Sequence, residues 1–182
     1  MRPEPLALGW RMALQGGETH LTALGCAIAA AMVFASAPAH AGDAKGTITY
    51  SAKSGPIVVA VKHAYLVKGP DFVSGKTIRR VVLSVADVGP KLGACATMMC
   101  SDGDITEGMT IDFDAGPRLN FWFVGNNQLV QYSGTAEPSS LKLTTDTPQR
   151  LAGKWDFDGS AAGGPKVQIE FDAPLVKEIT KK

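Results

Sequence analysis

Two cysteines and two methionines lie within six positions of the chain, in the segment CATMMC, residues 95–100. Thiolate and thioether sulfur atoms are soft donors, which select Cu(I) over the hard cations that carboxylates bind. Cys95, Met98, Met99 and Cys100 are therefore candidate metal ligands, and copper is the cofactor they would hold. The chain contains no second cluster of methionine or histidine to add ligands, so copper binding is the alternative rather than the first interpretation.

A disulfide between Cys95 and Cys100 is the interpretation that needs no ligand. In an exported protein these cysteines meet an oxidising compartment, and removal of the predicted leader, which contains Cys26, leaves an even number that favours a pair. Closing so short a ring stabilises a fold by about 2 kcal/mol in the chain-entropy model. We expect the ring to push Met98 and Met99 outward. A thiolate already in a disulfide cannot coordinate a metal, so the two interpretations exclude each other at any one moment.

Catalytic signatures are absent from the sequence. His63 is the only histidine left after the predicted leader, and its apolar strand neighbours favour a hydrogen-bonded core residue. The chain has no GxSxG, phosphate-loop or HExxH motif. The carboxylate pairs Asp112/Asp114 and Asp156/Asp158 alternate with apolar residues, which predicts that they lie on solvated faces. The sequence therefore favours a protein that is not an enzyme.

Two other metals fit the sequence less well than copper. Asp102, Asp104 and Glu107 occupy a glycine-containing loop that could supply oxygen ligands to calcium, but their spacing is not that of an EF-hand. A closed zinc site requires four ligands, and only His63 could join the two cysteines.

A binding face is predicted on the strand LNFWFV, residues 119–124. If Phe121 and Phe123 point into the core, then Trp122 and Asn120 point outward, because side chains alternate along a strand. An outward tryptophan on a sheet is either covered by a loop or offered to a ligand. We expect the cysteine loop to cover Trp122, and we take Trp122 and Asn120 as the candidate binding residues.

Alternation of apolar and polar residues dominates the chain after residue 41, as where Trp155 and Phe157 flank Asp156. Apolar residues at every second position, with polar residues between them, are typical of antiparallel strands that bury one face. The fold class is therefore all-β, a single antiparallel β-sandwich or small barrel, with one long cysteine-containing loop at residues 85–108. The predicted strands cover residues 46–51, 56–68, 77–84, 109–114, 119–124, 129–133, 141–145, 150–158 and 166–172, and we expect Pro174 to end the last one.

The N-terminal part of the chain has the pattern of a signal peptide. An uncharged apolar run over residues 21–37 leads to small residues at Ala39 and Ala41, which is the pattern that signal peptidase recognises. The run is short for a membrane span and lacks a basic stop signal. Residues 1–41 are therefore predicted to be a cleaved signal peptide, and residues 42–182 a single β-rich domain without a membrane span.

The remaining features narrow the partners and the compartment. The translation start is either Met1 or Met12, because starting at Met12 gives the leader an ordinary length. The formal net charge is +1, and lysines and arginines are scattered, which disfavours nucleic acid as a partner. We therefore expect a periplasmic or secreted, non-catalytic binding or structural module of a bacterial-type cell envelope, whose partner is a small ligand or an envelope protein.

Overall fold

The computed structural model describes residues 41–180, so the predicted signal peptide, except for its last residue, lies outside the described part of the chain. Within this part no helix is long and apolar enough to cross a bilayer. The described elements, in chain order, are β1 (Gly42–Ala52), β2 (Gly55–Ala60), β3 (His63–Pro70), β4 (Thr77–Ser84), α1 (Gly89–Ala94), α2 (Cys100–Gly103), β5 (Gly108–Phe113), β6 (Leu119–Gly125), β7 (Val130–Ala136), the 3-10 helix η1 (Pro138–Ser140), β8 (Leu141–Thr147), β9 (Arg150–Asp158), η2 (Ser160–Ala162) and β10 (Lys166–Glu178).

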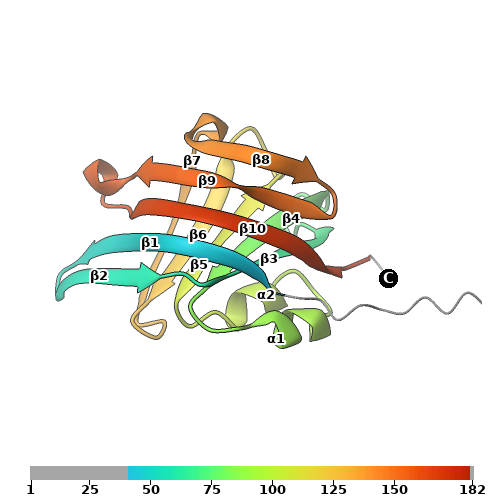
Figure 1. Cartoon of the computed structure of the whole chain (residues 1–182), viewed down its shortest axis with the longest axis horizontal. Helices are drawn as coiled ribbons and strands as arrows, with labels where there is room; N and C mark the ends of the chain where they lie inside the picture. Colours follow the sequence, from blue (N-terminus) through green and yellow to red (C-terminus); the bar gives the residue numbers. More distant parts are fainter. Residues whose placement is uncertain (1–40, 181–182) are drawn as a thin grey trace, which may run out of the picture. The chain divides into compact units, whose positions relative to one another are not determined.

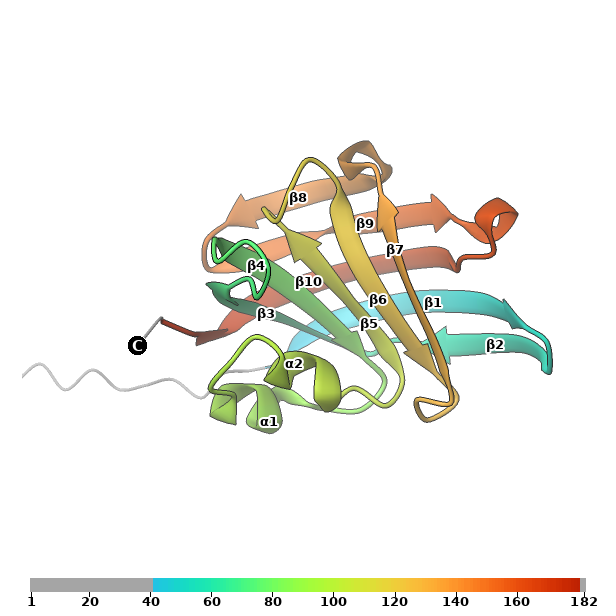
Figure 2. The same ribbon diagram turned by 180° about the vertical axis from the view of Figure 1, so that it is seen from behind.

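The strands form two packed layers (Figures 1 and 2). Layer A contains β7, β6, β5, β4 and β3 in spatial order, and layer B contains β2, β1, β10, β9 and β8. The first residues of β1 and the last residues of β10 both pair with β3 and join the layers. All these pairings are antiparallel except that of β10 with β3. The all-β, antiparallel prediction is confirmed, and because the strand path is open at β7 and β8 the sheet is not a closed barrel.

A hydrophobic core fills the space between the layers. Trp155 on β9 is fully buried, its ring lies 5.6 Å from that of Phe121 on β6, and it stacks on Phe157 at 5.5 Å. Its indole N–H donates to the Ser140 hydroxyl at 3.0 Å, which satisfies the one polar group of the ring. The inward placement of Trp155 and the exposed position of Asp156 are as the alternation predicts.

A second hydrophobic cluster lies on the outer face of layer A, beneath the cysteine loop. There Tyr65 and Val82 of the sheet pack with Leu92, Met98 and Ile105 of the loop. Figure 2 shows α1 and α2 against one end of this face. Residues 85–108 therefore form the long loop that the sequence predicts, but they contain two helices, which at six and four residues are too short to show a helical period.

The predicted strand over residues 56–68 is wrong in one respect, because it is two strands, β2 and β3. The chain crosses from one layer to the other at Val61 and Lys62, whose amides donate to β1 of layer B and to the end of β4 in layer A. The crossing changes which residues share a face. His63 therefore lies beside Tyr65, with ring centroids 6.3 Å apart, on the outer side of layer A rather than with the valines of β2.

The prediction that Pro174 ends the last strand is also wrong. β10 continues to Glu178, because after Pro174 it leaves β9 and pairs in parallel with β3. Proline lacks an amide hydrogen and is tolerated at strand irregularities. A register shift between Leu175 and Lys177 supplies such an irregularity immediately after it.

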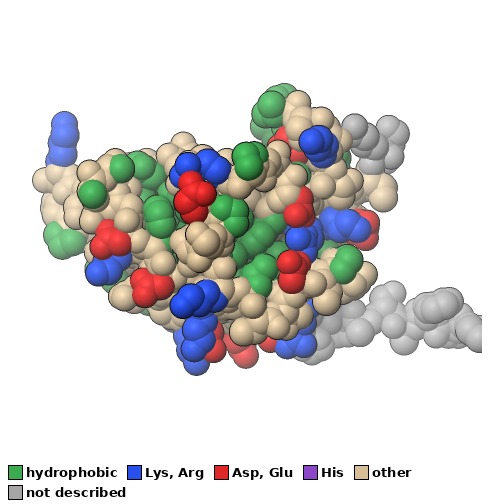
Figure 3. Space-filling view, turned by 90° about the horizontal axis from the view of Figure 1, so that it is seen from above, with side chains coloured by type: hydrophobic (Ala, Val, Ile, Leu, Met, Phe, Trp, Pro, Cys, Tyr) green, Lys and Arg blue, Asp and Glu red, His purple; other side chains and the backbone are tan. Residues whose placement is uncertain are grey.

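Charges of both signs are interspersed on the surface seen from above in Figure 3, and neither sign forms a continuous patch there.

Candidate functional site

The outer face of layer A brings residues from four neighbouring strands, β4 to β7, together. Because side chains alternate, every second residue of β4, β5 and β6 points away from the core between the layers. The register places these residues in two neighbouring rows: Arg80, Asp112 and Asn120 in one, and Thr110, Trp122 and Ser133 in the other.

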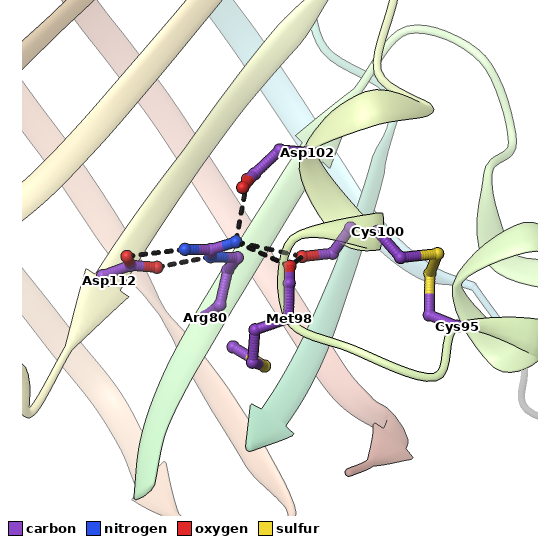
Figure 4. Close-up of polar contacts among 7 residues, drawn as sticks. Arg80, Cys95, Met98, Cys100, Asp102 and Asp112 are labelled. Carbon is purple, nitrogen blue, oxygen red and sulfur yellow. Dashed lines mark hydrogen bonds and ion pairs between the residues drawn. A yellow bond between two sulfur atoms is a disulfide. The ribbon is translucent and has the colours of Figure 1, made fainter. Parts of the chain in front are cut away.

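Arg80 binds the sheet and the cysteine loop at once (Figure 4). Its Nε and Nη2 donate to the two carboxylate oxygens of Asp112 at 2.5 and 2.8 Å. Its Nη1 donates to the Asp102 carboxylate at 2.8 Å, to the Met98 carbonyl at 3.0 Å and to the Ser101 hydroxyl at 3.1 Å. Bidentate charge-assisted bonds fix geometry as well as supplying energy. Arg80 therefore anchors α2 and the chain before it to β4 and β5.

The ion cluster is largely removed from water. The side chains of Arg80 and Asp112 are only 11% and 15% exposed, so the prediction that Asp112 lies on a solvated face is wrong. Its neighbour Asp114 is exposed and bonds instead to Arg79. The Arg80 guanidinium lies against Asp112 and bonds to both of its carboxylate oxygens. One guanidinium and two carboxylates leave the cluster with a net charge of −1.

The pKa of Asp102 is raised above its ordinary value, first because burial disfavours its charged form. The negative charge of Asp112 raises this pKa further, while the positive charge of Arg80 and its hydrogen bond lower it. The contacts of Asp102 with Arg80 thus offset the effect of its burial only in part.

Beside this cluster lies a hollow of about 380 Å³, which we call the outer-sheet hollow. Trp122 forms part of its wall and is half-buried, packed against the second hydrophobic cluster. Asn120 is exposed. The structure thus brings together the two residues that the sequence marks as a binding face, and Trp122 is only partly covered. The full lining is Arg80, Asp102, Thr110, Asp112, Asn120, Phe121, Trp122 and Ser133.

The predicted disulfide between Cys95 and Cys100 is present, with Cα atoms 5.6 Å apart. The expectation that both methionines point outward holds only for Met99, which is 62% exposed, because Met98 is buried. The Met98 thioether fits against Gly69 of β3, where a Cβ would lie only 2.9 Å from its sulfur. The absence of a side chain at Gly69 is therefore what admits Met98.

The four predicted sulfur ligands are not collected at one point. Figure 4 shows the Met98 side chain directed away from the disulfide. Instead, Asp104 lies near both cysteine sulfurs, with the three donor atoms within 4.8 Å of one another. While the disulfide is intact, neither sulfur is a thiolate that could bind a metal. The candidate set after reduction is therefore Cys95, Cys100 and Asp104.

The other sequence candidates are dispersed. Asp102 and Asp104, considered for calcium, pair with Arg80 and Lys91 respectively. The exposed Asp158 accepts hydrogen bonds from Ser160, which lower its pKa. Among the described residues, Asp102, Asp104 and Asp158 thus each have a different partner and form no common site.

Sequence reasoning missed Arg80, the central residue of the site. A signal was present in the strand TIRRVVLS, where Ile78, Arg80 and Val82 share the outer face. Two apolar residues on a face indicate that something covers it, and an arginine between them then requires buried acceptors. The positions of those acceptors, 22 and 32 residues later, cannot be read from spacing. In comparisons with known proteins, no family model, no curated protein and no solved structure matches the chain.

Proposed function

We propose that the protein is an exported, non-catalytic binding module of the cell envelope, periplasmic or secreted, that takes a small ligand in the outer-sheet hollow. The observation that carries this proposal is the hollow itself, walled by Trp122 and Asn120 beside the anchored Arg80 cluster. A concave site with an aromatic wall and a few convergent polar groups is the usual form of a small-molecule site.

The walls of the hollow are held in place by contacts within the protein itself. Its polar wall is fixed by the hydrogen bonds of Arg80, and its aromatic wall is held by packing against the second hydrophobic cluster. Groups already held in place lose less conformational entropy when a ligand binds. This rigidity supports a binding role over a purely structural one.

Export is supported by the disulfide, which suits an oxidising compartment. Intact-mass analysis of the envelope fraction tests it, and we expect an N-terminus near Gly42. Alkylation of the native protein without reductant should leave Cys95 and Cys100 unlabelled. Full-length, reduced protein in the cytoplasm would contradict export.

Binding is tested by NMR on ¹⁵N-labelled protein mixed with the small-molecule fraction of the envelope. We expect shifts centred on the Trp122 indole and the Thr110 amide, and we expect Trp122→Ala to abolish them. Phe72→Ala is the matched control, because Phe72 is an exposed aromatic that lines a separate apolar hollow between the β3–β4 turn and the cysteine loop. Shifts that survive Trp122→Ala, or that are lost in Phe72→Ala, would contradict the assignment.

Soft-metal binding, with copper as the candidate, is the second candidate function, favoured by the clustering of Cys95, Cys100 and Asp104. It would operate only in the reduced protein, because metal binding requires thiolates. Cu(I) titration of reduced protein against a competing chelator tests it. Tight Cu(I) binding by the reduced wild type that is lost in Cys95→Ser/Cys100→Ser supports the function. Cu(I) binding by the wild type no stronger than that of the double variant contradicts it. Met98→Ala/Met99→Ala in the same assay shows whether the methionines take part.

A further inference from the structure

We propose that the ligand of the outer-sheet hollow is a small organic cation, an ammonium group carried on an apolar skeleton. The inference rests on the proposed function, because it names the ligand class of the same hollow. Charge balance, free hydrogen-bonding groups and the aromatic wall each support it.

The charge balance of the hollow disfavours an anion. The charged residues that line it are Arg80, Asp102 and Asp112, with a net charge of −1. A guanidinium has five N–H donors. Nε and one hydrogen of Nη2 donate to the Asp112 carboxylate. Nη1 donates to the Asp102 carboxylate, the Met98 carbonyl and the Ser101 hydroxyl. Arg80 therefore has no free pair of donors for a second carboxylate or a phosphate, and an anion would meet two negative side chains.

The free hydrogen-bonding groups of the hollow include acceptors for an ammonium ion. Among the described residues, only one carboxylate oxygen of Asp102 accepts a hydrogen bond, and the other has no side-chain or backbone donor. Thr110 lines the hollow, and its hydroxyl makes no hydrogen bond in the described part of the chain; since no buried side-chain polar atom there lacks a partner, this hydroxyl is accessible and can accept a hydrogen bond. An ammonium group has three donors and no acceptor, which matches these groups.

The electrostatics of Asp102 point in the same direction. Its pKa is raised above the ordinary value, first by burial, and the charge of Arg80 offsets that effect only in part. A cation bound beside it would offset that effect further. The Trp122 ring adds apolar surface for the carbon skeleton and a π face that attracts cations.

A neutral, hydroxyl-rich ligand is the competing class, since it could also stack on Trp122 and bond to Asn120. It would satisfy the hydrogen bonds but leave the net charge of the hollow uncompensated. The two classes are therefore separated by charge rather than by shape.

The test titrates the oxidised protein with benzylamine, benzyl alcohol, benzoate and glucose at pH 7 and low salt. The readout is the Trp122 indole N–H signal in ¹⁵N–¹H spectra, assigned with Trp122→Phe. The indole signal of Trp155, which is buried in the core and bonded to Ser140, is the internal reference. We expect benzylammonium to bind roughly tenfold more tightly than benzyl alcohol, as a charge-assisted hydrogen bond would give, with benzoate weakest.

Matched variants assign the preference to residues. Asp102→Asn should weaken benzylammonium binding roughly tenfold and leave benzyl alcohol nearly unchanged. Asp104→Asn, in the same loop but outside the hollow and paired with Lys91, should change neither. Thr110→Val removes the free hydroxyl without touching the ion cluster, so its loss of benzylammonium affinity gives a second test if Asp102→Asn disturbs the fold.

The outcomes separate the ligand class from the proposed function. Equal or tighter binding of benzyl alcohol, glucose or benzoate at Trp122 overturns the cationic class and leaves the hollow as a binding site. No shift of the Trp122 signal with any probe overturns both the class and the small-ligand site. A tenfold preference that survives Asp102→Asn also overturns the cationic assignment.

Discussion

Replacing Arg80 with methionine should destabilise the protein far more than the same replacement at an exposed ion pair. Methionine keeps an unbranched side chain but leaves Asp112, Asp102 and the Met98 carbonyl without their donor. Removing one partner of a buried ion pair costs about 3–5 kcal/mol of unfolding free energy. Because the Asp102 side chain is 32% exposed and can recruit water, we expect the lower end, about 3 kcal/mol.

Urea denaturation of the oxidised protein at pH 7, followed by circular dichroism, measures this loss. Arg118→Met is the matched control, because Arg118 pairs with Glu137 and both side chains are at least half exposed. Exposed pairs contribute about 0–1 kcal/mol, so the two midpoints should separate clearly. The slope of unfolding free energy against urea should stay similar, since the same surface is exposed in each variant.

A loss at Arg80→Met no larger than that at Arg118→Met would refute the reasoning. It would mean that the hydrophobic contacts of Met98 and Leu92 hold the loop without the ion cluster. Trp122 fluorescence offers an independent check, because release of the loop should expose the ring and shift its emission to longer wavelength.

Three further predictions concern the core, the disulfide and one titrating turn. Trp155→Ala should cost about 3–5 kcal/mol of unfolding free energy in urea, while Asp156→Ala should be nearly silent, and the reverse order would mean that the strand register is wrong. Cys95→Ser/Cys100→Ser should lower the stability of the oxidised protein by about 2 kcal/mol, and an unchanged midpoint would show that the ring does not constrain the unfolded chain. The Asp71 carboxylate accepts hydrogen bonds that lower its pKa. Wild type should therefore have a higher thermal midpoint than Asp71→Asn above pH 4, and it should lose that advantage as the pH falls through the lowered pKa. A difference in midpoint that stays constant across the titration would mean that ionisation of Asp71 does not contribute to stability.

The strands and their inward faces could be predicted from the sequence because alternation is a local property. A strand that buries one face must repeat with period two, and this repeat is visible around Trp155 without knowledge of its partners. The Cys95–Cys100 pair was predictable for a similar reason, since these two cysteines are close together in the chain and the third, Cys26, lies in the predicted leader. Trp122 and Asn120 followed from the same alternation on β6.

The long-range pairings were decided by the tertiary structure alone. Nothing local marks Val61 and Lys62 as the crossing between layers, because both β2 and β3 are extended and apolar. β10 passes beyond Pro174 because β3 offers a new partner there, and that partner lies more than 100 positions earlier in the chain.

The candidate site shows the same division. The sequence alone determined that polar residues such as Asp112 of β5 and Asn120 of β6 alternate with apolar residues. Only the pairing of β4 with β5 decided that Arg80 meets Asp112 across the sheet, and only the folded loop decided that Asp102 reaches the same guanidinium. The physical reason is that alternation depends on neighbours in the chain, whereas charge pairing and a concave wall depend on groups that only tertiary packing brings within a few ångströms of one another.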